Sequence, residues 1–150
     1  FNFSRGSAMI QAQYYNFVRL GRAGYTEIVQ NMLANAAHLN DALSSSGRFE
    51  ILNPRLAEPV VTFRLAGDPG FDVFQLSDKL RERGWIVPAY TLPPNAEHVE
   101  LLRVVVRNDM SRTKVDALIA HMNAAYESLE RSAAETHPGR KTHEGQRRRC

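Results

Sequence analysis

The sequence predicts an α+β fold in which a long N-terminal helix precedes a small, mainly antiparallel sheet with helices on one face. Two observations lead to this prediction. From Tyr14 to Leu43, apolar residues recur at steps of three or four, which is the period of an amphipathic helix. Beyond residue 47, short segments rich in branched and aromatic residues and helix-period segments follow in the order strand, strand, helix, strand, strand, helix.

Length and composition indicate one globular domain of ordinary size. The chain has 150 residues, 43% of them hydrophobic, and no apolar run approaches the ~20 residues that cross a bilayer. No signal-peptide pattern opens the chain and Cys150 is the single cysteine, so no internal disulfide can form and a cytoplasmic location is expected. The chain begins at Phe1 without an initiator methionine, which suggests a piece of a larger polypeptide.

The net charge of +3 originates in the C-terminal tail. Residues 137–150 carry five arginines and lysines against one glutamate, which leaves 14 basic and 15 acidic residues in the rest of the chain. A domain that binds nucleic acid usually presents a basic face of its own, with aromatic residues or a reading helix. The near-neutral body shows neither feature, so nucleic acid is not an expected partner.

The first helix is predicted over residues 7–46. Gly21 and Gly24 lie within it and would weaken an isolated helix, so they indicate either close packing or a bend. Gly47 follows three serines and is suited to a left-handed cap that ends the helix. A helix this long in so small a domain is expected to reach a neighbouring domain or subunit.

The remaining elements follow from alternation and from turn residues. Strands are predicted over residues 49–52, 59–65, 85–88 and 99–107, the last as a buried strand, with a proline-punctuated loop over 90–96. Asp72 can cap a helix together with Gln75, and Gly84 ends that helix after Arg83. Ser111 can cap a last helix, and the composition after residue 134 is typical of a disordered tail.

Arg103 is the first candidate for a binding residue. On the pleat it shares one face with Leu101 and Val105, whereas the other face is wholly apolar. A guanidinium in such a strand needs an anionic partner, and its planar fork can hold a carboxylate or a phosphate at two points. The partner is either an Asp or Glu of the same fold or a carboxylate of a substrate, and the residues alone leave both alternatives open.

The sequence gives little support for a metal site, a hydrolase site or a phosphate-binding loop. The histidines lack a spacing that puts two ligands on one helix face, so no metal site is expected; they are His38, His98, His121, His137 and His143. No Gly-x-Ser-x-Gly elbow and no Gly-x-x-x-x-Gly-Lys phosphate loop occurs. The stretch Asn2-Phe-Ser-Arg5 precedes the long helix, where Ser4 can either cap the helix or help to bind a phosphate.

Several stretches together resemble glutamate decarboxylase, a family of pyridoxal-phosphate enzymes with the aspartate-aminotransferase fold, fold type I. The first is Asn-Phe-Ser-Arg followed by Gln-Tyr-Tyr-Asn-Phe-Val-Arg-Leu-Gly-Arg-Ala-Gly-Tyr at 13–25. The others are Asp-Pro-Gly-Phe at 68–71, Leu-Arg-Glu-Arg-Gly-Trp-Ile-Val-Pro-Ala-Tyr-Thr-Leu at 80–92, and Leu-Arg-Val-Val-Val-Arg at 102–107. The resemblance spans about residues 1–138.

The resemblance implies the C-terminal part of an enzyme that converts L-glutamate to 4-aminobutyrate and carbon dioxide with pyridoxal 5'-phosphate. Residues 1–46 would end the large cofactor-binding domain and form a connecting helix, 47–134 would form the small C-terminal domain, and 135–150 a basic tail. The family's substrate-carboxylate arginine falls on Arg103, and its serine that contacts the cofactor phosphate across a dimer interface falls on Ser4. A homodimer or a dimer-based oligomer is therefore expected.

The resemblance also implies that the catalytic residues lie upstream of this chain. The family's cofactor-binding lysine stands in a Ser-x-His-Lys motif, whereas Lys79, Lys114 and Lys141 follow Asp, Thr and Arg. The chain alone is therefore expected to be inactive.

The tail is not predicted to bind calmodulin, and two functions other than that of an enzyme fragment remain open. The tail lacks the aromatic anchors of a calmodulin-binding helix, so calmodulin is not an expected partner. The alternatives to an enzyme fragment are a non-catalytic oligomerisation module and an α+β module that binds an acidic ligand without reaction.

Overall fold

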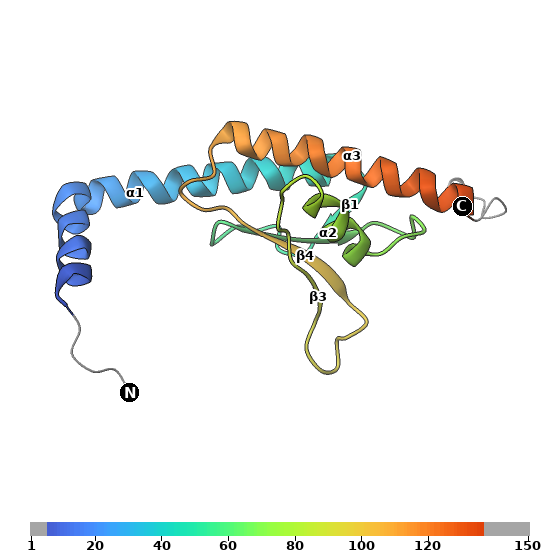
Figure 1. The fold of residues 1–150 in the computed structure, drawn as a ribbon, viewed down its shortest axis with the longest axis horizontal. Coiled ribbons are helices and arrows are strands. Elements are labelled where there is room, and N and C mark those ends of the chain that lie inside the picture. Colours follow the sequence, from blue (N-terminus) through green and yellow to red (C-terminus); the bar gives the residue numbers. More distant parts are fainter. Residues whose placement is uncertain (1–5, 137–150) are drawn as a thin grey trace, which may run out of the picture.

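The order of elements is the predicted one, from the long first helix to the last (Figure 1). The structure is a computed structural model, and it describes residues 6–136. Its helices and strands are α1 (Ala8–Ser45), β1 (Phe49–Ile51), β2 (Val60–Leu65), α2 (Val73–Arg81), β3 (Ala89–Thr91), β4 (Glu100–Val105) and α3 (Arg112–Thr136). No described helix combines the length and the apolarity that crossing a bilayer requires.

The four strands form one antiparallel sheet in the order β1-β2-β4-β3. Helix α1 packs on β1 and β2, α2 packs on β3 and β4, and α3 packs against both helices. The helices therefore cover one face of the sheet, as predicted, and no described helix covers the other face, which we call the open face. Side chains of the sheet and of the helices meet between them and form the core, which includes Phe49, Val61, Phe63, Leu102, Val104, Leu118 and Met122.

The prediction of a buried strand around Arg103 is correct for the face toward the helices, whereas on the other face Leu101 is buried but Arg103 and Val105 are exposed. Leu102, Val104 and Val106 are buried against the helices, whereas Arg103 is exposed and Val105 retains 47% of its exposure. The run of branched residues resembles a strand buried on both faces, but β4 has helices on only one side.

The predicted strand over residues 85–88 is wrong, because β3 begins at Ala89. The segment before it folds back on α2: the Trp85 amide donates to the Leu80 carbonyl, and the Ser77 hydroxyl donates to the Val87 carbonyl. Pro88 lies opposite Arg103 and accepts a hydrogen bond from the Arg103 amide at 3.1 Å. A proline has no N–H to return that bond, so regular pairing starts one residue later.

Helix α1 bends at Gly21, which agrees with the second of the two predicted alternatives, close packing or a bend. Its φ of 55° and ψ of −169° are not helical, and they lie in a region that essentially only glycine occupies. The bend brings the rings of Phe17 and Tyr25 to 5.8 Å between centroids. Gly24 stays helical, and a methyl group in place of its hydrogen would lie 3.1 Å from the Leu20 Cβ.

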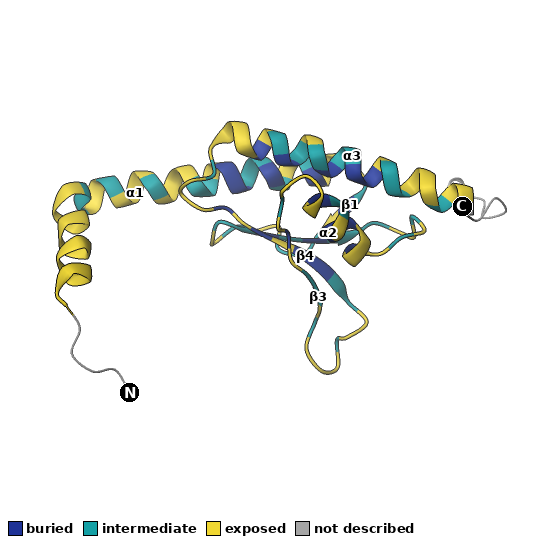
Figure 2. Ribbon diagram, in the orientation of Figure 1, coloured by how far each residue is buried: buried dark blue, intermediate teal, exposed yellow. Residues whose placement is uncertain are grey.

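The two parts of α1 differ in their surroundings (Figure 2). After the bend, Ala36, Leu39 and Leu43 enter the core. Before the bend, six large apolar side chains are more than half exposed, whereas Leu20 next to the bend is partly buried; the six are Met9, Ile10, Tyr14, Tyr15, Phe17 and Val18. Because these residues occur at both i+1 and i+4 spacing, they surround the helix rather than forming one stripe. We call residues 8–20 the apolar arm.

The predicted helix caps agree with the structure, although α2 ends at Arg81, two residues before its predicted end. The Asp72 side chain accepts a hydrogen bond from the Gln75 amide at 2.8 Å, and the Gln75 side chain accepts one from the Asp72 amide at 2.9 Å, which completes the capping box. The Ser111 hydroxyl accepts a bond from the Lys114 amide at 3.3 Å. Gly47 and Gly84 have positive φ values of 70° and 80° after the first and second helices.

A prediction for Gly21 follows from its backbone angles. We expect Gly21→Ala to lower the free energy of unfolding by about 1–3 kcal/mol, because alanine is strained at these angles. If the helix ran straight through residue 21, the same change would raise stability by about 1 kcal/mol. Urea unfolding followed by circular dichroism distinguishes the two signs, and Arg22→Ala, at a regular helical position, is the matched control.

A second prediction concerns Tyr126, which is buried beside Phe49 and Phe71. Burial raises the pKa of Tyr126, the Glu130 carboxylate raises it further, and Arg48 opposes the rise. An unfolded tyrosine ionises near pH 10, so the unfolded state gains stability above that pH while the folded state keeps the proton. We expect the folded state to lose stability above about pH 10, and Tyr126→Phe to lose less over the same range. Equal losses in denaturant titrations of both proteins would contradict this.

Candidate functional site

The open face of the sheet gathers several polar side chains around Arg103. The register places Thr62 of β2 directly opposite Arg103, and Tyr90 of β3 opposite Leu101. Tyr90 and Arg103 are therefore diagonal neighbours on the same face, a spacing that an aromatic and a long side chain can bridge. Arg64 lies on this face too, opposite Glu50 of β1.

The Arg103 guanidinium lies over the Tyr90 ring, with its Cζ 5.5 Å from the ring centroid. The Thr62 hydroxyl is directed away from Arg103, because it donates to the Asn53 Oδ1 at 2.7 Å. The same Asn53 oxygen accepts the Thr62 amide, and the Asn53 amide group donates to the Val60 carbonyl. Asn53 thus holds the edge of β2 in place beside Arg103.

Arg103 has no carboxylate partner within residues 6–136. The ion pairs of that range join His38–Asp116, Arg48–Glu127, Arg64–Glu50, Lys79–Glu82 and Arg107–Asp109. The described part of the chain therefore contains no Asp or Glu that pairs with Arg103, which was the first of the two predicted alternatives. The arginine instead stands at the solvent-facing side of the sheet, with its N–H donors available.

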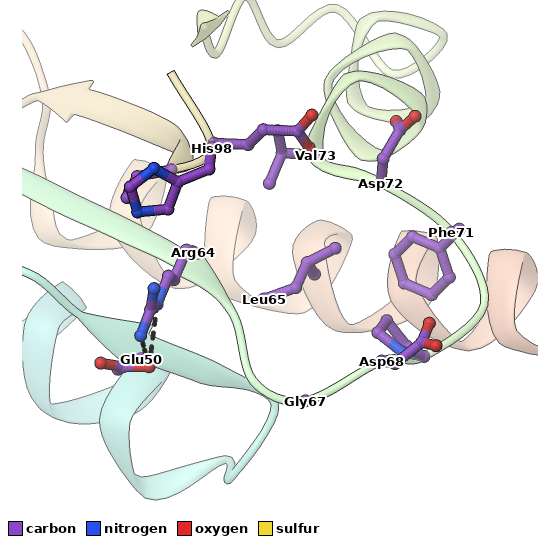
Figure 3. A pocket seen from close by; sticks show the side chains of 12 residues that line it. Glu50, Arg64, Leu65, Gly67, Asp68, Phe71, Asp72, Val73 and His98 are labelled. Carbon is purple, nitrogen blue, oxygen red and sulfur yellow. Dashed lines mark hydrogen bonds and ion pairs between the residues drawn. The ribbon is translucent and has the colours of Figure 1, made fainter. Parts of the chain in front are cut away.

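Arg64 shows what a neutralised arginine on the same face looks like (Figure 3). Its Nε and Nη2 atoms both donate to the Glu50 Oε2, at 2.9 and 2.7 Å. This pair borders a hollow of about 400 Å³ that reaches to the start of α2. Two acidic residues of the hollow serve the backbone: Asp68 accepts the Gly70 amide, and Asp72 caps α2. The hollow therefore has a structural explanation in the turn that precedes α2.

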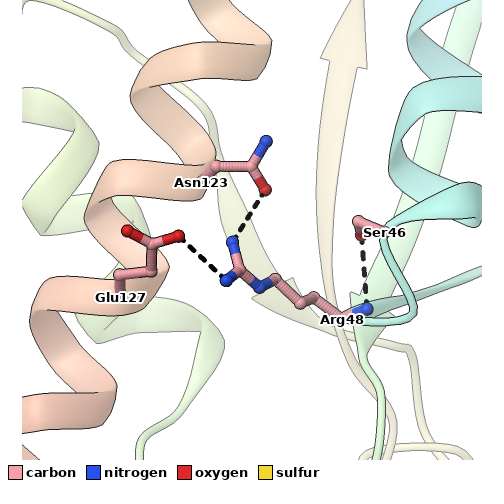
Figure 4. A network of polar contacts seen from close by, with 4 residues as sticks. All are labelled: Ser46, Arg48, Asn123 and Glu127. Carbon is pink, nitrogen blue, oxygen red and sulfur yellow. Dashed lines mark hydrogen bonds and ion pairs between the residues drawn. The ribbon is translucent and has the colours of Figure 1, made fainter.

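Arg48 shows a third arrangement (Figure 4). Its Nη1 donates to the Asn123 Oδ1 at 3.0 Å and its Nη2 to the Glu127 Oε1 at 2.9 Å, while its Cζ lies 5.0 Å from the centroid of the Tyr126 ring. These contacts join the start of β1 to α3. The guanidinium groups of Arg48 and Arg103 both lie over tyrosine rings, but only Arg48 also has a carboxylate partner in the described chain.

The two described lysines make contacts within the fold. Lys79 pairs with Glu82 at 2.8 Å and Lys114 donates to the Asp109 carbonyl at 2.9 Å, and both belong to helices on the covered side of the sheet. Ser4 and Lys141 lie outside the described residues. Within residues 6–136 no group of three or more His, Cys, Asp or Glu side chains is arranged to hold a metal ion.

Two helix histidines have structural partners. His38 Nε2 lies 2.7 Å from the Asp116 Oδ1 and so links α1 to α3. His121 Nδ1 accepts a hydrogen bond from the Trp85 Nε1 at 2.8 Å, which holds the segment before β3 against α3. Both histidines thus connect elements of the fold.

Sequence reasoning missed the neighbours of Arg103. The pattern of residues favours a strand before Pro88 and so puts Tyr90 in a loop, and Thr62 and Asn53 carry no distinguishing motif. The available signal is the proline itself: a residue that cannot donate to a strand ladder is suited to a strand start, which moves β3 onto Ala89–Thr91 and Tyr90 into the sheet.

The fold occurs in known decarboxylases. The rice (Oryza sativa) TDC, solved with PLP and tryptamine, superposes with a TM-score of 0.64 at 19% identity, over 76% of this chain and 25% of that one. At that identity the likeness concerns the fold alone. No family model matches the chain.

Glutamate decarboxylases resemble the chain in sequence as well as in fold. The Lactobacillus brevis enzyme structure matches with a TM-score of 0.82 and 32% identity, over 87% of this chain and 30% of that one. Glutamate decarboxylase of Petunia hybrida is 43% identical over 129 residues, which are 86% of this chain and 26% of the relative. The chain is therefore homologous to part of glutamate decarboxylase, and it spans about a quarter of the length of such curated relatives.

Proposed function

We propose that this chain is the C-terminal part of a glutamate decarboxylase, which converts L-glutamate to 4-aminobutyrate and carbon dioxide. The observation that carries the proposal is Arg103, which is exposed on the open face without a carboxylate partner in the described chain. The similarity to glutamate decarboxylases over 86% of the chain supports it. The opposite face of the same strand belongs to the core, so the strand holds the arginine rigidly.

Arg103 is assigned to bind a carboxylate of the substrate. A guanidinium can donate two parallel N–H bonds to one carboxylate and so fix its orientation as well as its position. Fixing the substrate in this way sets the direction of the bond that is to break. The role of this chain is thus to hold the substrate, while bond cleavage belongs to residues outside it.

We assign the cofactor to the remainder of the longer protein. Pyridoxal phosphate, when bound, supplies the electron sink for decarboxylation, and the described lysines are engaged elsewhere. Ser4 is assigned to the cofactor phosphate, in keeping with a hydroxyl that precedes a helix. Residues 1–46 would belong to the large domain and its connecting helix, 47–134 to the small domain, and 135–150 to a basic tail.

The apolar arm supports a proposal about assembly. Its large side chains are exposed on several sides, and monomeric proteins rarely leave so much contiguous apolar surface in water. We assign this surface to the large domain and to a second subunit of a cytoplasmic homodimer or dimer-based oligomer. A non-catalytic oligomerisation module would share this feature, but it would not require Arg103.

Replacement of Arg103 tests the proposed function. In the full-length enzyme we expect Arg103→Lys to lower kcat/KM at least about tenfold, because an ammonium cannot reproduce the two-point contact. A charge-assisted bond contributes about 1.5–3 kcal/mol, which corresponds to about 10-fold or more in rate. Steady-state kinetics with L-glutamate measures the effect.

Arg64→Lys is the matched control for that experiment. Arg64 lies on the same face of the sheet, but its guanidinium is already paired with Glu50. We expect this variant to keep kcat/KM close to that of the wild type. Near-normal kinetics of Arg103→Lys, with a lowered melting temperature, would instead indicate a purely structural arginine and would overturn the assignment.

Removal of the apolar arm's side chains tests the assembly proposal. We expect the chain on its own to self-associate or to bind an apolar fluorescent dye, because the surface that covers the arm is absent. The triple change Ile10→Gln, Tyr14→Gln and Val18→Gln should reduce both. A triple change at exposed polar positions, Gln11→Ala, Asn16→Ala and Arg19→Ala, is the control. A stable monomer without dye binding would contradict the proposal.

A further inference from the structure

The contact between Arg103 and Tyr90 uses only one part of the guanidinium. A guanidinium has five N–H donors in its plane, whereas its flat face can lie on an aromatic ring. The Arg103 Cζ lies over the Tyr90 ring at 5.5 Å, within the range of a cation–π contact. A cation–π contact of this kind holds the charged group without a hydrogen bond to any of its N–H donors.

Arg48 and Arg103 differ in the partners of their N–H donors. The Arg48 Cζ lies over the Tyr126 ring at 5.0 Å, but the Nη1 and Nη2 atoms of Arg48 also donate to Asn123 and Glu127. That arrangement is complete, and it joins two elements of the fold. Arg103 has the cation–π contact, but it has no carboxylate partner within residues 6–136. In the proposed function, the substrate carboxylate supplies this missing partner.

The sheet fixes the ring that supports Arg103. Tyr90 is half-buried in β3, and its register partner Leu101 is buried although it points to the open face. The amide of Arg103 is bound to the Pro88 carbonyl, two residues before Tyr90. The backbones of the two residues are thus tied together by the same pair of strands. A long arginine side chain otherwise samples many rotamers, which oppose binding when they are lost.

We propose that Tyr90 is a positioning residue for the substrate carboxylate: its ring holds the Arg103 guanidinium in place while leaving the in-plane N–H donors free for that carboxylate. This inference rests on the proposed function, since it requires that Arg103 binds the substrate. Tyr90 itself makes no bond to the substrate. Its contribution is to binding in both the ground state and the transition state, so it acts chiefly on KM.

The test compares two changes of Tyr90 in the full-length holoenzyme. Tyr90→Phe keeps the ring, whereas Tyr90→Leu keeps apolar bulk and removes the π system. The readouts are KM for L-glutamate, kcat, and the inhibition constant of glutarate, a dicarboxylate without the amino group. We expect Tyr90→Leu to raise KM and the inhibition constant about fivefold with a smaller change in kcat, and Tyr90→Phe to stay within twofold of the wild type.

A double-variant cycle shows whether Tyr90 acts through Arg103. In the Arg103→Met background, which removes the charge, we expect Tyr90→Leu to change the inhibition constant by less than twofold. Thermal melts of all variants measure folding separately, and the loss of glutarate affinity in Tyr90→Leu should exceed any change explained by unfolded protein.

Two results would overturn the inference, and they are distinguishable. In the first result, Arg103→Met weakens glutarate binding, but Tyr90→Leu either has no effect or has the same effect with and without Arg103→Met. Tyr90 then has no positioning role, and the proposed function stands. If Arg103→Met leaves glutarate binding unchanged, the carboxylate assignment of Arg103 fails, and the role of Tyr90 fails with it.

Discussion

The pleat of β4 is the constraint on which the rest of the structure depends. Leu102 and Val104 of β4, and Val106 just after it, are buried in the core, so the strand cannot slip by one residue without exposing apolar side chains. That same register fixes Arg103 on the open face, opposite Thr62 and diagonal to Tyr90. Packing on one side of the strand therefore determines the direction of the charged group on the other.

The chain uses arginine in three ways that differ only in what surrounds the guanidinium. Arg64 is neutralised by Glu50 within the sheet, and Arg48 joins β1 to α3 through Asn123 and Glu127. Both contribute to the fold. Arg103 is equally well placed by the backbone, but the described residues around it supply a ring instead of a carboxylate. The difference between a structural and a binding arginine lies in the neighbours, which a residue's own strand does not reveal.

The spacing of residues along the sequence is sufficient to predict the order of elements and the two faces of β4. It also limits Gly21 to two alternatives, close packing or a bend. Each of these predictions depends on residues that are close in sequence. The spacing is insufficient where a distant partner decides. The segment around Trp85 has strand-forming residues, yet Ser77 and His121 hold it against helices. The exposure of Arg103 depends on which side of the sheet the helices occupy. Tyr90 can be linked to Arg103 only once the pairing of β3 with β4 is known.

The two strands at the edges of the sheet, β1 and β3, are only three residues long. An edge strand offers unpaired N–H and C=O groups that can recruit a strand from another chain, and short edges leave few of them. This sheet therefore provides little backbone for β-augmentation or for growth into a larger continuous sheet. Neighbouring polypeptide is left to recognise side-chain surfaces, whose shape and charge differ from one protein to another, rather than the backbone groups that all proteins share.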